Sequence, residues 1–180
     1  MKKIFVFFLV MGVIASALVS CALTEPRPEI KEGKFRFSVT YEVDGREETV
    51  SSVLVCKFVD VVAAVDGAYR EWDSYIEDGA LAARLEQTRG YLLLKNTDDG
   101  EIYLDLNLTA QYFMADPDFD VSDEDVDSPD RIGPRLFIEY NSEKYEEIAE
   151  SYSEDAAVLE TYGVKLIGFE YDQPIKNSFN

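Results

Sequence analysis

Residues 34–43 alternate strictly between apolar and polar side chains. The apolar positions are Phe35, Phe37, Val39, Tyr41 and Val43. A period of two residues is typical of a half-buried β-strand, because successive side chains point to opposite faces. Asp44-Gly45 follows, a pair that suits a two-residue type I′ hairpin turn because both positions need positive φ. The segment therefore predicts a β-hairpin with the residues that come next.

Pairing across this turn fixes the register of the hairpin. It sets Tyr41 opposite Glu48, Val39 opposite Val50, Phe37 opposite Ser52 and Phe35 opposite Leu54. Because residues two apart lie on the same face, Leu54 and Cys56 share the face of Phe35. Cys56 is therefore expected to be an inert core residue.

A second hairpin is expected from residues 91–94 and 102–108. Gly100 suits the αL position of a three-residue loop, which sets Leu94 opposite Leu104 and Leu92 opposite Leu106. The inward positions are Ile102, Leu104, Leu106 and Leu108, and the outward positions are Glu101, Tyr103, Asp105 and Asn107. Residues 136–140 and 164–171 are further strand candidates.

Helix is expected mainly late in the chain. Tyr145, Ile148, Ala149 and Tyr152 follow helical spacing, and a second stretch, capped at Ser153, runs over 154–162 to Gly163. Residues 81–87, closed by Gly90, favour another short helix. Together these patterns predict a mainly β fold, either a β-sandwich or a curled antiparallel sheet, with one or two short C-terminal helices. An α+β fold is the alternative.

The first twenty residues have the layout of a secretory signal peptide. Lys2 and Lys3 precede an almost unbroken apolar run over residues 4–19, which ends in small residues. The run of about 16 residues is shorter than the roughly 20 that a membrane-spanning helix needs. No Lys or Arg follows closely to stop translocation. Cleavage is therefore expected.

The run ends in Leu18-Val19-Ser20-Cys21, which resembles the lipobox of bacterial lipoproteins. The resemblance implies cleavage before Cys21 and a diacylglyceryl thioether on its sulfur. Two acyl chains would hold the protein firmly on the extracytoplasmic face of the cell membrane. The alternative is an ordinary signal peptide or an uncleaved anchor with an incidental cysteine, in which case Cys21 and Cys56 could form a disulfide.

The chain of 180 residues is of a length that one folded domain accounts for. We expect a signal peptide over 1–20, a lipidated N-terminus and linker over 21–33, and a single β-rich domain over 34–180. The linker contains two prolines and no apolar periodicity, so it is expected to be semi-stiff and to span roughly 40 Å.

The charge balance narrows the choice of partner. Asp and Glu number 36 against 17 Lys and Arg, giving a net charge of -19 without any His. Removal of residues 1–20 would leave 15 basic and 36 acidic residues, or -21. Such a surface repels phosphate backbones, so nucleic acid is not expected as a partner. An envelope protein, a glycan or a cation remains compatible.

Residues 116–130 form the most conspicuous polar stretch. Its alternating acids resemble an EF-hand loop, with Asp116, Asp118, Asp120, Glu124 and Asp127 at the first, third, fifth, ninth and twelfth positions. Val121 replaces the usual turn glycine, and position twelve lacks the bidentate Glu. The segment is either a calcium site or a solvated acidic loop.

Tyr69, Trp72 and Tyr75 form a short aromatic cluster. If exposed, such rings stack on sugars, which makes the cluster a candidate glycan site. The alternative is packing at the core or its rim, the usual role of a single tryptophan in a small domain.

The sequence offers no catalytic residues with a defined pattern. Without His, the Ser-His-Asp and Cys-His arrangements are excluded, and no glycine-rich phosphate loop occurs. A pair of carboxylates for glycoside hydrolysis remains available among the many acids. Apart from the lipid on Cys21 and calcium at the acidic loop, no cofactor is expected.

The chain resembles small uncharacterised lipoproteins of anaerobic gut-type bacteria in three sequence segments, FRFSVTYEVDG, GEIYLDLNL and YGVKLIGFEYD. The resemblance covers most of the mature chain and implies localisation and fold without an activity. The sequence therefore favours a membrane-anchored lipoprotein with a non-catalytic binding or accessory domain. The alternative is a cell-surface hydrolase that uses a carboxylate pair.

Overall fold

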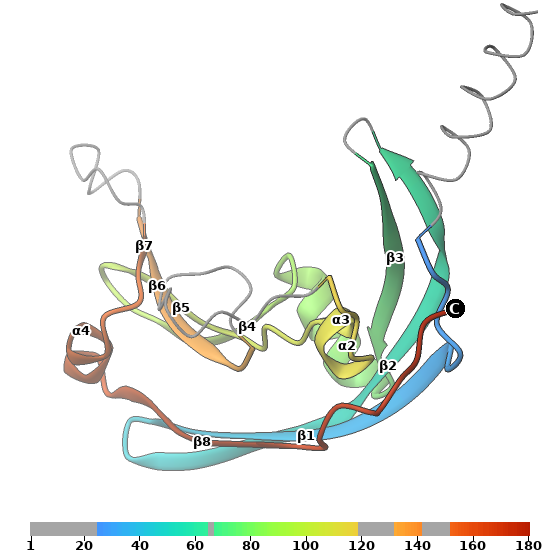
Figure 1. Cartoon of the computed structure of the whole chain (residues 1–180). Coiled ribbons are helices and arrows are strands. Elements are labelled where there is room, and N and C mark those ends of the chain that lie inside the picture. Colours follow the sequence, from blue (N-terminus) through green and yellow to red (C-terminus); the bar gives the residue numbers. More distant parts are fainter. Residues whose placement is uncertain (1–24, 65–66, 119–131, 142–151) are drawn as a thin grey trace, which may run out of the picture.

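The computed structural model describes residues 25–64, 67–118, 132–141 and 152–180. Within them the strands form two four-stranded antiparallel sheets, ordered β3-β2-β1-β8 and β4-β5-β6-β7 (Figure 1). The first comprises β1 (Glu32–Val43), β2 (Arg46–Ala64), β3 (Gly67–Ile76) and β8 (Val164–Tyr171). The second comprises β4 (Tyr91–Asn96), β5 (Gly100–Asp105), β6 (Arg135–Tyr140) and β7 (Tyr152–Ser153).

The first sheet is strongly curled, and the second sheet lies in its concavity (Figure 1). The inward side chains of both sheets form one hydrophobic core, which includes Phe35, Val39, Ile102, Leu104 and Ile138. The predictions of a mainly β fold and of a curled antiparallel sheet are confirmed.

Three short helices occur in the described part of the chain. They are α2 (Gly79–Gln87), α3 (Ala110–Phe113) and α4 (Ala156–Thr161). The helices expected at 81–87 and 154–162 are confirmed, although the second is capped by the Asp155 carboxylate rather than by Ser153. The helix expected through Tyr145, Ile148 and Ala149 lies outside the described residues, whereas Tyr152 belongs to β7.

The β1–β2 hairpin has the predicted register. Phe35 pairs with Leu54, Phe37 with Ser52, Val39 with Val50 and Tyr41 with Glu48. Asp44 and Gly45 have φ values of 52° and 77°, as a type I′ turn requires. Residues beyond the hairpin also hold this turn. Asp44 forms an ion pair with Lys95 of β4, and the Lys95 ammonium group donates to the Tyr162 carbonyl.

The predicted register of the second hairpin was wrong. Leu92 pairs with Leu104, and a bulge at Leu94 shifts the pairing so that Lys95 lies opposite Ile102. Gly100 is a strand residue at which an added Cβ would collide with the Glu139 carbonyl, so it does not supply an αL turn. The turn is held instead by the Thr97 hydroxyl, which accepts from the amides of Asp99 and Gly100. The inward positions of β5 are nevertheless as predicted.

Cys56 is fully buried, as expected, and burial raises the pKa of its thiol to about 12. Since the thiolate is the reactive form, we expect an aromatic disulfide reagent to label Cys56 at least about a hundredfold more slowly in native protein than in denaturant. The absorbance of the released thiol measures both rates. Equal rates would contradict the buried position.

Residues 25–31 of the predicted linker over 21–33 are hydrogen-bonded to the C-terminal residues, whereas residues 21–24 lie outside the described part of the chain. The amide of Arg27 donates to the Asn180 carbonyl at 2.8 Å, and the Asn180 amide donates back at 2.9 Å. The Glu29 amide donates to the Ser178 carbonyl at 2.8 Å. Pro28 forms an isolated bridge with Phe179. The prolines keep this segment extended, and here an extended backbone pairs with the C-terminal residues instead of acting as a spacer.

Candidate functional site

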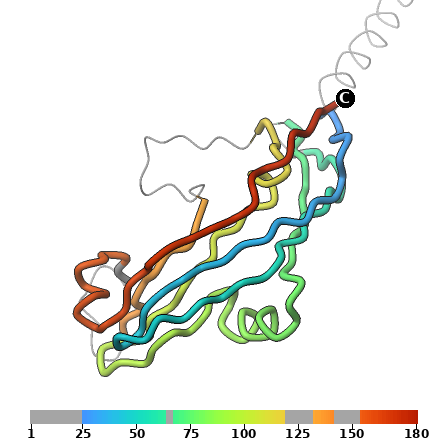
Figure 2. Tube along the Cα trace, turned by 90° about the horizontal axis from the view of Figure 1, so that it is seen from below, coloured from blue at the N-terminus to red at the C-terminus, as the bar shows by residue number. Residues whose placement is uncertain are grey.

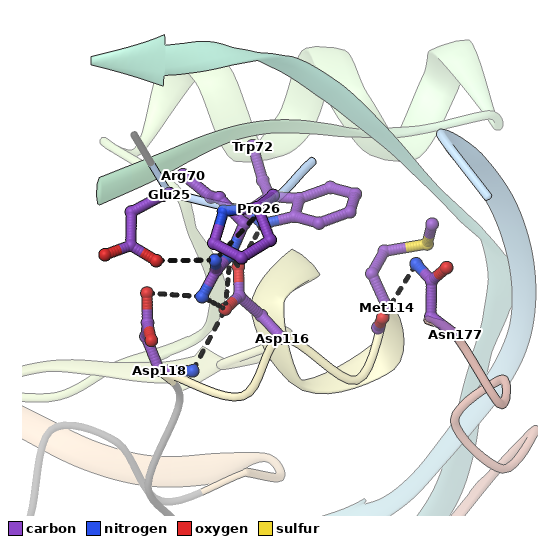
Figure 3. A network of polar contacts seen from close by, with 8 residues as sticks. All are labelled: Glu25, Pro26, Arg70, Trp72, Met114, Asp116, Asp118 and Asn177. Carbon is purple, nitrogen blue, oxygen red and sulfur yellow. Dashed lines mark hydrogen bonds and ion pairs between the residues drawn. The ribbon is translucent and has the colours of Figure 1, made fainter. Parts of the chain in front are cut away.

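The acidic stretch begins in a buried ion-pair cluster centred on Arg70 of β3 (Figure 3). Its Nε donates to both oxygens of Asp116 at 2.9 and 3.0 Å. The Trp72 indole donates to Asp116 Oδ2 at 2.6 Å. We call Glu25, Arg70, Trp72, Asp116 and Asp118 the Arg70 cluster.

The Arg70 cluster joins segments that are distant in the sequence. Arg70 Nη1 donates to Glu25 Oε2 at 2.9 Å and to the Pro26 carbonyl at 3.3 Å, and Nη2 forms an ion pair with Asp118. The Phe179 ring lies 5.0 Å from the guanidinium carbon, within cation-π range. One side chain thus connects β3 with residues 25–26, with the C-terminal Phe179 and with the segment after α3.

Burial and ion pairing have opposite effects on the pKa values of Arg70 and Asp116. The side chains of Arg70 and Asp116 are 1% and 2% exposed. Burial raises the pKa of Asp116. Hydrogen bonds from Arg70, the Asp118 amide and Trp72 lower it by more than burial raises it, so the pKa of Asp116 is below its usual value. Likewise burial lowers the pKa of Arg70, and the bonds to Asp116 more than restore it. Both groups are therefore charged near neutral pH, and the cluster is a structural clamp rather than a proton donor or acceptor at that pH.

The predicted calcium ligands fall into two groups. Asp116 and Asp118 pair with Arg70, so a cation there would compete with a guanidinium for their oxygens. Asp120, Glu124 and Asp127 lie outside the described residues. Across the described ranges, no three acidic or thiol side chains are grouped as a metal site. Calcium binding stays a prediction.

The structure divides the predicted aromatic cluster between the two faces of β3. Trp72 lies on the Arg70 face, half-buried, with its ring 5.4 Å from Phe58. Tyr69 and Tyr75 alternate to the opposite face, where they are 50% and 46% exposed. The three rings therefore do not share one surface. Sugar binding by the exposed pair stays a prediction.

A second candidate site is a groove of about 700 Å³ on the outer face of β4, β5 and β6. Its side chains are mostly polar or aromatic, and we call it the outer groove. They include Arg89, Tyr91, Asn96, Glu101, Tyr103 and Glu139. The sequence pattern predicts that Glu101 and Tyr103 face outward but does not join them to a site.

Strand register builds the outer groove. It sets Glu101 opposite Glu139 and Tyr103 opposite Phe137. The Tyr103 and Phe137 rings stack with centroids 5.5 Å apart, and Tyr91 meets Phe137 edge-on at 5.0 Å. Each of these contacts is in the preferred range for aromatic pairs, so Phe137 holds in place Tyr91 and Tyr103, which line the groove as an aromatic wall.

Two features bring charge to this wall. Arg89 has a φ of 57° and Gly90 a φ of 97°, and this tight turn leads from α2 into β4 with Arg89 at the edge of the groove. The Tyr103 hydroxyl donates to Glu101 Oε2 at 2.5 Å. That hydrogen bond, with burial, raises the pKa of Tyr103 to about 12. The phenol therefore stays protonated and holds the Glu101 carboxylate in place.

Comparison of the chain with protein-family models, curated proteins and solved structures finds no match. No helix among the described residues has the length and apolar character to cross a bilayer.

Proposed function

We propose that the chain is a membrane-anchored, extracytoplasmic lipoprotein whose β domain is a non-catalytic binding module. The observation that carries the proposal is Cys21, placed directly after an apolar run in the sequence Leu-Val-Ser-Cys. Two acyl chains on that sulfur would provide stable attachment, where one chain is marginal.

The packed N-terminal segment supports a short tether. Only residues 22–24 separate Cys21 from Glu25, which pairs with Arg70. At 3.3–3.6 Å per residue, the four steps from Cys21 to Glu25 reach about 14 Å at most. A lipidated chain would therefore hold this end of the domain against the headgroups, in place of the roughly 40 Å spacing expected for a free linker.

The outer groove extends toward the opposite end of the domain. Residues 25–31 and the C-terminus lie together at one end, whereas the turns at 44–45 and 97–100 lie at the other (Figures 1 and 2). Asn96, Thr97 and Gly100 contribute to the groove at that far end. An anchored molecule would thus present the groove away from the membrane.

Replacing Cys21 with alanine tests the anchor. We expect the variant to move from the membrane to the soluble fraction and to lose incorporation of labelled palmitate, because no other exposed thiol can carry the lipid. Cys56→Ala is the matched control and should keep both properties, since Cys56 is buried. A Cys21→Ala protein that stays as firmly membrane-bound as the unmodified chain would overturn the proposal.

A carboxylate-pair hydrolase is the second candidate function. Glu101 and Glu139 lie directly opposite each other on β5 and β6. Opposed residues in a sheet have Cβ atoms about 4.5–5.5 Å apart, which brings their carboxyl groups within reach of the spacing that retaining glycosidases use. Both side chains are exposed, however, whereas a general acid is usually a buried carboxyl. We therefore propose binding as the primary function.

A further inference from the structure

The outer groove has the shape and chemistry of a small-ligand site, and this deepens the proposed binding function on which it rests. We infer that it binds a neutral saccharide. Its volume of about 700 Å³ lies within the usual 300–1,000 Å³ of such sites. Tyr91, Glu101, Tyr103 and Glu139 lie on paired strands, so the sheet holds this part of the groove in place.

The aromatic wall supplies the first element of sugar recognition. A pyranose ring presents faces of C–H groups, which pack against the electron-rich face or edge of an aromatic ring. Tyr91 is half-buried and lines the groove, with its orientation fixed by the edge contact to Phe137. A ligand contacting Tyr91 therefore meets a ring that is already ordered, which lowers the entropy cost of binding.

The polar rim supplies the second element. Sugar hydroxyls both donate and accept hydrogen bonds, so a matching site needs partners of both kinds. Glu101 and Glu139 accept, Arg89 donates, and the Asn96 amide does both. All four are exposed, and Glu101 is held by Tyr103. The rim thus offers acceptors and donors around the same wall.

Charge selects against other ligands. Two carboxylates face one guanidinium in the groove, and the whole chain carries -19, so phosphates and acidic sugars are repelled. A bare divalent cation is a weaker fit, since in the portion of the chain that the structure describes no three suitable ligands converge. A basic peptide would match the carboxylates but would bring its cations against Arg89. A neutral, hydroxyl-rich ligand satisfies every group of the rim.

The test is titration calorimetry of the detergent-solubilised full chain with neutral oligosaccharides of glucose, mannose, galactose and N-acetylglucosamine. We expect at least one to bind at millimolar affinity or better. Tyr91→Ala and Glu139→Gln should each weaken binding about tenfold, the loss expected for one aromatic or charged hydrogen-bonding contact. Glu71→Gln, an exposed carboxylate on β3, is the matched control and should leave affinity unchanged.

The outcomes separate this inference from the proposed function. Absence of binding to every oligosaccharide, or equal binding by Glu139→Gln, overturns the saccharide site while the Cys21 experiment still decides the anchor. Because Glu139 is exposed, its variant should fold even if Tyr91→Ala does not. Binding of oligolysine instead of sugars also overturns the inference. Release of new reducing ends would support the saccharide site and overturn the non-catalytic role.

Discussion

Replacing Arg70 with methionine is expected to lower the free energy of unfolding by about 3–5 kcal/mol. Methionine keeps much of the aliphatic stem but removes the cation. The substitution leaves the Asp116 carboxylate, 2% exposed, without its ion-pair partner inside the protein. It also releases Glu25 and the Pro26 carbonyl and removes the cation-π contact with Phe179, so residues 25–26 and the C-terminal segment each lose a fixed contact.

Urea denaturation of the chain produced without its lipid, followed by tryptophan fluorescence, measures this loss. Trp72 donates to Asp116 and therefore reports on the cluster itself. Arg36→Met is the matched control, because the Arg36–Asp172 pair is on the surface, with the Arg36 side chain 81% exposed. Removing an exposed pair costs about 0–1 kcal/mol. If the two variants were equally stable, the Arg70 cluster would not be the clamp described above.

The same cluster predicts how stability changes in acid. The folded-state pKa of Asp116 is lowered, so its contribution is fully present above the unfolded-state pKa of about 4. It is lost as the pH falls through the still lower folded-state pKa. In Arg70→Met the main partner that lowers this pKa is gone, so the fall in stability below pH 4 should be shallower. If the free energy of unfolding fell equally steeply with pH in Arg70→Met and in the unmodified protein, Asp116 would not be the group that links stability to pH.

The second large effect is expected in the core. Phe113→Ala should cost about 3–5 kcal/mol, because it removes a ring that is 1% exposed and leaves a cavity. The ring packs against Phe35 of β1 at 4.9 Å and against Tyr171 of β8 at 5.8 Å. It thereby fixes the four-residue helix α3 to the concave face of the first sheet.

Chemical denaturation measures this change, with Leu166→Ala as control. Leu166→Ala also removes apolar carbons, three against the six removed by Phe113→Ala, but Leu166 is 40% exposed, so its truncation should cost less than about 1.5 kcal/mol. A Phe113→Ala protein as stable as the Leu166→Ala protein would show that α3 does not depend on this ring.

The fold was predictable where local patterns agree with each other. Strict alternation over residues 34–43 and an Asp-Gly turn determine both the face and the register of the first hairpin, since a slip by one residue would expose every apolar side chain. The second hairpin lacked this constraint. A run of leucines fits several registers, and the bulge at Leu94 depends on packing that the local sequence does not specify.

Strand β3 was missed because its inner face carries a charge. Arg70 and Trp72 point to the Arg70 cluster, while Tyr69, Glu71, Asp73 and Tyr75 point outward, so apolar and polar residues do not alternate. Arg70 is tolerated there only because Asp116, 46 residues further along the chain, neutralises it. A partner so distant gives no local signal.

For the candidate sites, too, the sequence showed some of the residues but not how they come together. Asp116 was conspicuous in the sequence, but its role as the partner of Arg70 follows only from the fold. The outer groove was missed for another reason: it combines the end of α2 with residues from three strands, and each part alone has ordinary surface composition. The outward Glu101 and Tyr103, two residues apart, were the one available signal.

The position of β1 has a mechanical consequence. The strand starts beside the packed residues 25–31, ends at the Asp44-Gly45 turn at the far end, and is bonded along its length to β2 and β8. Interstrand hydrogen bonds are perpendicular to the strands, so tension between these two ends would load many of them at once in shear. A molecule held at one end and pulled at the other along β1 would resist extension. A force perpendicular to the strands would instead break the interstrand hydrogen bonds one after another.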